Sequence, residues 1–209
     1  MTGTRTSWGF SGVAAAALFL AGFWLIGNSG DNGAEVMAFY AENRTRSIVA
    51  FLCFALAALA YVCFTAALRG VLAQAEAEPR TLTALGYGGG LLTAALLVVG
   101  AAPTAALGEA ANGATAGSSD AFWLVSNLTY PVVTIGIGFS SLLALAAGLV
   151  ALRTGVLPRW FAWASIAAAP LILVAVVFLP VFVWLAWTAV GGLVVATSSP
   201  RMVTVPATR

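Results

Sequence analysis

Charged residues are scarce in this chain of 209 residues. They make up 8% of it, lysine is absent, and hydrophobic residues make up 61%, which gives a mean hydropathy of +1.00. A soluble domain carries about 25% charged residues. The few charges stand in short clusters between long apolar runs, a pattern that excludes an ordinary soluble protein. We therefore expect residues 1–209 to form a single membrane domain.

Histidine is absent as well. This excludes haem held by two histidines, histidine-ligated zinc or copper, and Ser-His or Cys-His nucleophile pairs. Cys53 and Cys63 would lie about 15 Å apart on a helix, too far for a disulfide, and we expect them to behave as small hydrophobic residues. The net charge of +2 gives no basic face for nucleic acid. We expect no metal, no cofactor and no nucleic-acid partner.

Six apolar stretches are candidates for helices that cross the hydrocarbon core, which takes about 20 residues. They are residues 8–27, 47–68, 82–102, 122–152, 158–177 and 180–197. The fourth is too long for one straight span. The last two share one uncharged stretch, in which Pro180 favours a tight turn near Phe178–Val181. We predict an all-α, polytopic bundle of six transmembrane helices. The alternative is five, with one long helix kinked at the proline.

The distribution of arginine favours six spans by the positive-inside rule. With a cytoplasmic N-terminus, the inside segments hold Arg5, Arg69, Arg80, Arg153, Arg159, Arg201 and Arg209. The outside segments hold only Arg44 and Arg46. Five spans would move the last two arginines outside and remove the bias. The predicted topology therefore has both chain ends in the cytoplasm.

The first outside segment has the pattern of a short amphipathic helix. Asn32 can cap its N-terminus, and Glu35 follows three residues later, as in a capping box. At 100° per residue, four apolar side chains fall on one arc: Val36, Met37, Phe39 and Tyr40. We expect this helix to lie on the outer membrane surface or over the bundle. Residues 109–120, rich in small and polar residues, predict a flexible loop.

The fourth predicted span carries the clearest polar pattern. Asn127, Tyr130, Pro131, Thr134 and Ser141 form one stripe about 100° wide on a helical wheel. The proline cannot donate a hydrogen bond to the carbonyl four residues earlier, so that carbonyl needs another partner. Two interpretations stay open. The stripe packs against other helices, as polar and small residues commonly do in membranes, or it lines a cavity that binds a ligand.

Other spans carry packing signals. Gly86 and Gly90 have the small-xxx-small spacing that permits close helix approach. Trp160 and Trp163 stand near the cytoplasmic start of the fifth span, where an aromatic belt is expected. Trp184 and Trp187 lie deeper, and we expect them to pack inside the bundle.

Three segments resemble a known group of bacterial membrane proteins. They are Ala34–Asn43 with the arginine that follows, Leu68-Arg69 at the end of the second span, and Thr154–Trp163 before the fifth. Through these segments the chain, from about Trp8 to Thr197, resembles the domain-of-unknown-function 4386 family. The resemblance implies a helical, multi-pass protein of the bacterial plasma membrane. It implies no catalytic residues.

The residues favour a non-enzymatic membrane protein that binds lipid or a partner, or has a regulatory or structural role. No acid or arginine lies near the middle of any predicted span, where ion-coupled transporters place such groups. The alternative is a small transporter or channel for a neutral or amphiphilic solute, using the polar stripe. An intramembrane lipid or quinone enzyme is the least favoured function. The expected partners are membrane lipid and either another membrane protein or a second copy.

Overall fold

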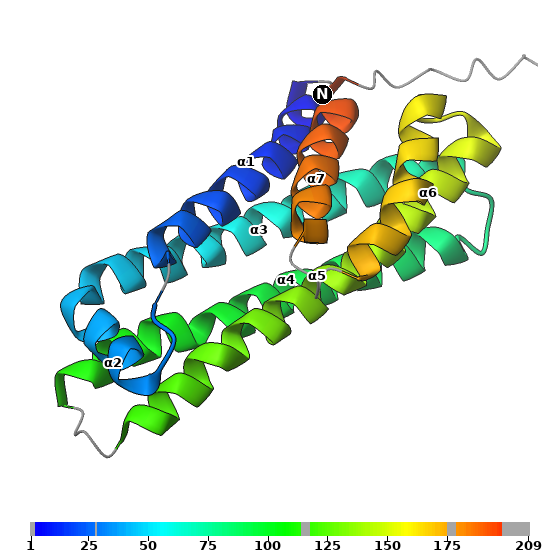
Figure 1. Cartoon of the computed structure of the whole chain (residues 1–209). Helices are drawn as coiled ribbons and strands as arrows, with labels where there is room; N and C mark the ends of the chain where they lie inside the picture. The colour runs from blue at the N-terminus through cyan, green and yellow to red at the C-terminus, as the bar shows by residue number, and fades with distance from the viewer. Residues whose placement is uncertain (1–2, 28, 114–117, 175–178, 198–209) are drawn as a thin grey trace, which may run out of the picture.

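The computed structural model describes residues 3–27, 29–113, 118–174 and 179–197, and within them every regular element is helical (Figure 1). In chain order the elements are α1 (Gly3–Ile26), α2 (Gly33–Glu42), α3 (Arg44–Ala75), α4 (Thr81–Ala110), the 3-10 turn η1 (Ala111–Gly113), α5 (Ser119–Thr154), α6 (Arg159–Leu173) and α7 (Leu179–Thr197). The predicted all-α fold is confirmed.

Four of these helices, α1, α3, α4 and α5, are long and apolar enough to cross a membrane. The last three contain 32, 30 and 36 residues. At about 1.5 Å per residue they span roughly 45–54 Å, well beyond the hydrocarbon thickness of about 30 Å. Their ends must therefore project past the apolar layer. α6 and α7 are apolar too, but contain only 15 and 19 residues.

The helices differ from the predicted spans at their ends. The predicted spans 47–68 and 82–102 lie inside α3 and α4, because charge ends an apolar run without ending a helix. α4 continues through Pro103 into the predicted loop 109–120. α5 is one continuous helix through Pro131. α6 ends at Leu173, short of the predicted residue 177. The predicted turn near Phe178–Val181 falls partly outside the described residues, and α7 already begins at Leu179.

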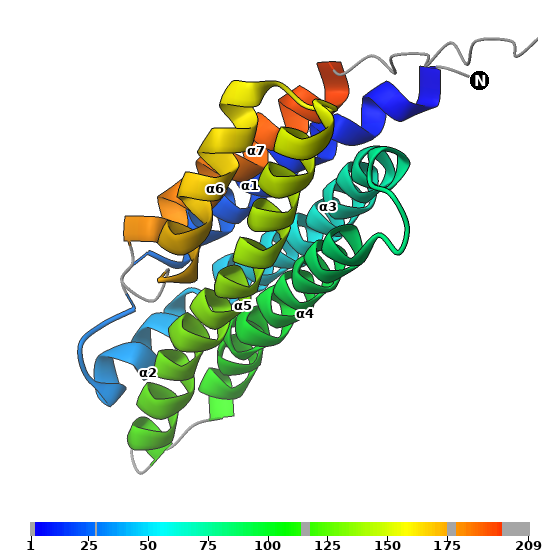
Figure 2. The ribbon, with the colours of Figure 1, turned by 90° about the vertical axis from the view of Figure 1, so that its right-hand side faces the viewer.

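The six longer helices pack in a ring. α1 contacts α3, α3 contacts α4, and the sequence continues through α5, α6 and α7 back to α1 (Figures 1 and 2). Successive members run in opposite directions. One end of the ring, called here the arginine end, carries Arg69, Arg80, Arg153 and Arg159. The other, the α2 end, carries Arg44 and Arg46. These arginines thus lie at opposite ends of the ring, and the predicted topology stays a prediction.

The pair formed by α6 and α7 covers only part of this ring. The carbonyl oxygen of Leu173, the last residue of α6, lies 3.6 Å from where a Cβ on Gly138 would stand. Gly138 is near the middle of α5, which continues past α6 toward α2 (Figure 2). The ring is therefore complete only in the half nearer the arginine end.

Glycines set the spacing of α4 against its neighbours. A Cβ on Gly86 would lie 2.8 Å from the Cβ of Ala146 on α5. A Cβ on Gly90 would overlap the side chain of Thr65 on α3. The predicted close approach is confirmed, although the two glycines face different helices. Only a residue without a side chain fits at either contact.

The predicted amphipathic helix is α2. The Asn32 side chain accepts a hydrogen bond from the Glu35 N–H at 3.0 Å, and the Glu35 carboxylate accepts one from the Asp31 N–H at 2.8 Å. Val36 and Tyr40 are buried, while Glu35 is exposed. The apolar face packs against the ends of α4 and α5, in a small cluster with Leu107, Ala111 and Phe122. The helix lies over the bundle, one of the two predicted placements.

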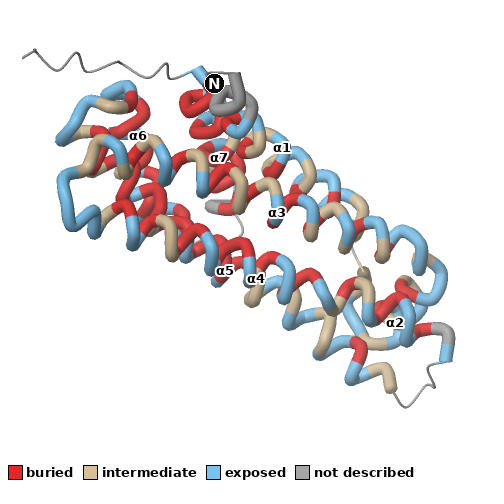
Figure 3. Tube along the Cα trace, turned by 180° about the vertical axis from the view of Figure 1, so that it is seen from behind, coloured by how far each residue is buried: buried red, intermediate tan, exposed pale blue. Residues whose placement is uncertain are grey.

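The interior of the ring contains several large aromatic side chains. Figure 3 marks the buried residues along the chain in red. Trp184 is fully buried, and its ring centroid lies 5.2 Å from that of Phe19 and 5.5 Å from that of Tyr61. Trp187 is buried and donates a hydrogen bond from Nε1 to Ser165 Oγ at 2.9 Å. The prediction that these two tryptophans pack inside is confirmed. Such edge-to-face aromatic contacts stabilise a core beyond simple burial.

Candidate functional site

The predicted polar stripe on α5 is divided between the interior and the surface. Thr134 and Ser141 are buried, Pro131 is half-buried, and Asn127 and Tyr130 are exposed. The stripe therefore changes surroundings along its length, since its first turns lie beyond the end of α6.

Two polar groups of the stripe bond to their own helix. The Asn127 amide donates to the Trp123 carbonyl at 2.8 Å. The Thr134 hydroxyl is shared between the carbonyls of Tyr130, at 2.9 Å, and Pro131, at 3.2 Å. A hydroxyl can supply a backbone bond near a proline, which has no N–H to give. Neither pocket described below includes a residue of the stripe. The cavity interpretation stays a prediction.

A buried polar cluster lies inside the ring, where four helices meet. It comprises Tyr61, Thr93, Ser140 and Trp184, all fully buried. The Tyr61 hydroxyl lies beside the polar groups of the other three. The Thr93 and Ser140 hydroxyls donate to backbone carbonyls of their own helices, at 2.9 Å and 2.6 Å. Tyr61 Oη and Trp184 Nε1 complete no hydrogen bond of normal geometry with any described residue.

Two acids at the α2 end, Glu109 and Glu35, bond to separate partners. Glu109 accepts two hydrogen bonds from the Arg44 guanidinium, at 2.6 Å and 3.2 Å, which joins the end of α4 to the start of α3. The Glu35 carboxylate accepts the hydrogen bond from the Asp31 N–H just before the N-terminus of α2. Among the described residues, no three Cys, Asp or Glu side chains lie close enough together to hold a metal ion.

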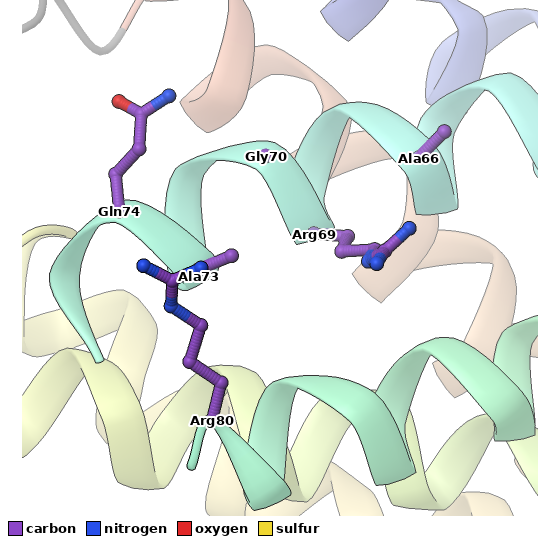
Figure 4. A pocket seen from close by; sticks show the side chains of 6 residues that line it. All are labelled: Ala66, Arg69, Gly70, Ala73, Gln74 and Arg80. Carbon is purple, nitrogen blue, oxygen red and sulfur yellow. The ribbon is translucent and has the colours of Figure 1, made fainter. Parts of the chain in front are cut away.

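The arginine end has a groove between the last turns of α3 and the start of α4 (Figure 4). We call it the arginine groove, a pocket of about 330 Å³ lined by Ala66, Arg69, Gly70, Ala73, Gln74 and Arg80. Arg69 points from α3 toward the space beside α4, and Arg80 extends from the other side toward α3 (Figure 4). A Cβ on Gly70 would meet nothing within 4 Å, so the groove has open space above this residue.

The positive charges of the two guanidiniums in the groove are only weakly neutralised by their described neighbours. The Arg69 guanidinium carbon lies 4.5 Å from the centre of the Tyr87 ring, a cation–π contact that holds it without neutralising it. Arg80 has one weak ion pair, 3.7 Å from Glu78, and both side chains are at least half exposed. A pair of exposed guanidiniums is suited to phosphate, which their N–H groups can bind in a bidentate manner.

A second pocket, of about 440 Å³, adjoins the groove on the side of α5. Arg80 lines both pockets, and Arg153 and Thr154 of α5 line the second. Glu76 also lines it, but both its carboxylate oxygens accept backbone N–H groups of α4, from Leu82 at 3.1 Å and Thr83 at 2.8 Å. Burial raises the pKa of Glu76, yet these bonds and the charge of Arg153 lower it by more. The acid is thus committed to capping α4.

Comparison with known proteins identifies the family. A sequence family described as "Domain of unknown function (DUF4386)" matches residues 9–205. The chain belongs to this family. The resemblance inferred from the sequence is confirmed, over nearly the whole chain. No curated protein and no solved structure matches the chain.

The description of DUF4386 names no activity, so a site in this member has to be argued from its geometry. The sequence contained a signal for the arginine groove. Arg69 directly follows one apolar run, and Arg80 stands in the short segment before the next apolar run. The sequence did not reveal how far α3 continues beyond the apolar run. Because α3 continues to Ala75, its last turns bring Arg69 into the lining of the same pocket as Arg80.

Proposed function

We propose that this DUF4386 protein is a non-enzymatic, multi-pass protein of the bacterial plasma membrane that binds anionic phospholipid headgroups in the arginine groove. The carrying observation is the pair of exposed guanidiniums, Arg69 and Arg80, on either side of one pocket. Basic pockets between helices on the cytoplasmic side of a membrane are suited to lipid phosphates.

The depth of the groove supports a lipid ligand. Arg69 directly follows the predicted apolar span 47–68, and α3 continues beyond it to Ala75. The guanidinium therefore stands at the boundary between hydrocarbon and water, where headgroup phosphates lie. Ala66 and Gly70 are exposed beside it, and such small residues leave room for the glycerol and the first carbons of an acyl chain.

The proposal includes six crossings with both chain ends in the cytoplasm. The support is the separation of arginines between the two ends and the alternating direction of the six ring helices. In that topology α6 and α7 cross as a short pair. Snorkelling flanking residues and local thinning of the bilayer accommodate such short helices. The exposed Trp160 and Trp163 at the start of α6 suit an interfacial anchor.

Two observations make us prefer binding to transport or catalysis. Trp184 and Tyr61 are fully buried in the middle of the ring, on the line that a central pore would need. The polar groups of Asn127 and Thr134 bond to their own helix. Transport along the stripe would require a rearrangement of α6 and α7.

The test is lipid retention by the purified protein, measured by native mass spectrometry with phosphatidylglycerol and phosphatidylcholine. We expect the wild type to prefer phosphatidylglycerol, and Arg69→Gln and Arg80→Gln each to weaken it about fivefold, the effect of one arginine near a membrane surface. Arg159→Gln is the matched control, because Arg159 is exposed at the same end and lines neither pocket. Equal retention of both lipids by the wild type would contradict the proposal, as would equal losses in all three variants.

A further inference from the structure

The two pockets at the arginine end meet at one side chain. The arginine groove holds Arg69 and Arg80, and the second pocket holds Arg80 and Arg153. Arg80 thus lines two spaces of about 330 and 440 Å³, each of which is also lined by a second arginine. A ligand with one phosphate would use only one of these spaces.

We infer that the preferred ligand is a glycerophospholipid with two phosphates, of the cardiolipin class, with one phosphate in each pocket and Arg80 between them. This inference rests on the proposed lipid-binding function and specifies its substrate class. The two phosphates of such a lipid are joined by a short glycerol bridge. That bridge matches a site in which one central arginine is flanked by two others from different helices, α3 and α5.

The backbone around Arg80 supports this placement. Arg80 is the N-cap residue of α4 and has a left-handed backbone conformation, with φ of 55°. At this point, where α4 begins, Arg80 lines one pocket with residues of α3 and another with residues of α5. Figure 4 shows the Arg80 side chain extending away from the start of α4 toward α3.

The acid in the second pocket is bonded to the N-terminus of α4. Both carboxylate oxygens of Glu76 accept hydrogen bonds from the N–H groups of Leu82 and Thr83, so the carboxylate caps the N-terminus of α4. The remaining polar lining includes the exposed Thr81, whose hydroxyl can contact a phosphate oxygen. The Thr154 hydroxyl donates to the Val150 carbonyl at 2.8 Å. Arg153 and Thr154 are both exposed. A headgroup can reach them from the membrane surface.

The experiment compares cardiolipin with phosphatidylglycerol at equal phosphate concentration, by native mass spectrometry of the intact protein. We expect the wild type to bind cardiolipin about fivefold more tightly, since one further arginine takes part. Arg153→Gln should remove this preference and leave phosphatidylglycerol binding unchanged. Arg69→Gln should weaken both lipids, and Arg159→Gln should change neither.

The outcomes separate the two proposals. If the wild type binds both lipids equally, or if Arg153→Gln keeps the preference, the two-phosphate inference is wrong while lipid binding stands. If the wild type binds neither lipid, both proposals fail. Soluble pyrophosphate is added in a further arm. Displacement of cardiolipin by an equal concentration of pyrophosphate would assign the site to a free diphosphate and overturn the lipid assignment.

Discussion

Replacement of Gly86 by alanine tests the packing of α4 on α5 directly. The added Cβ would lie 2.8 Å from the Cβ of Ala146 and 3.3 Å from the Cα of Leu143. Two carbon atoms pack best at about 3.5–4.0 Å. Neither neighbour is the flexible end of a long side chain, so the helices themselves would have to separate by about 0.7 Å to restore contact.

The expected cost follows from this geometry. Overpacking of a well-packed core costs about 1–3 kcal/mol, and we expect Gly86→Ala to fall in that range. Gly88→Ala is the control in the same helix, because a Cβ there would meet nothing within 4 Å. It should be neutral, or stabilising by up to about 1 kcal/mol, since alanine forms helix more readily than glycine. Unfolding in mixed micelles by dodecyl sulfate, followed by tryptophan fluorescence, measures both.

A double-mutant cycle identifies the contact. Ala146→Gly alone loses a buried methyl group and helix propensity, about 1–2 kcal/mol together. The swap Gly86→Ala with Ala146→Gly keeps the total volume, so its cost should be less than the sum of the two single costs by about 1–2 kcal/mol. If the costs simply add, the two positions do not meet. If Gly86→Ala is as stable as Gly88→Ala, the close approach of α4 and α5 is wrong.

Two other predictions concern topology and the cap of α4. In a background without Cys53 and Cys63, single cysteines at Glu109, Glu76 and Thr197 are labelled in intact cells with an impermeant maleimide. We expect only the Glu109 site to react before permeabilisation, and reaction at Thr197 would contradict six crossings. Glu76→Ala should cost about 1 kcal/mol at neutral pH through the lost cap. Because the folded pKa of Glu76 is lowered, its stabilisation is present above the ordinary value of 4.5 and is lost as the pH falls through the folded pKa. The variant should lack this acid-dependent loss, which melting curves at several pH values measure, and Glu78→Ala should retain it.

The helices were predictable from the sequence because lipid imposes one constraint on all of them. An apolar backbone segment must satisfy its hydrogen bonds internally, so an uncharged run becomes helix whatever its detailed sequence. For the same reason Pro131 did not divide α5. The capping pattern of Asn32 and Glu35 was equally local, and it predicted both the start and the buried face of α2.

The ends of the helices and the partners of polar groups were less predictable. Hydropathy reports where an apolar run ends, and α3 and α4 continue as helices past the ends of their apolar runs. The residues of the polar stripe lie on one face of α5. Whether each of them is buried or exposed depends on where α6 ends, at Leu173. Similarly, Gly86 and Gly90 share a spacing and yet pack on different helices. Such facts depend on how helices assemble, which periodicity within one helix does not contain.

The most informative position in such a chain is where an apolar run and its helix end at different residues. At the arginine end, the run stops at Leu68 and α3 stops at Ala75. The intervening turns carry Arg69 and place small residues beside it. The same chain then returns with Arg80 at the start of α4. On the proposed function, a site for lipid phosphate needs no residue inside the bundle. It requires that a helix outlast its apolar run by about two turns, which is roughly 11 Å.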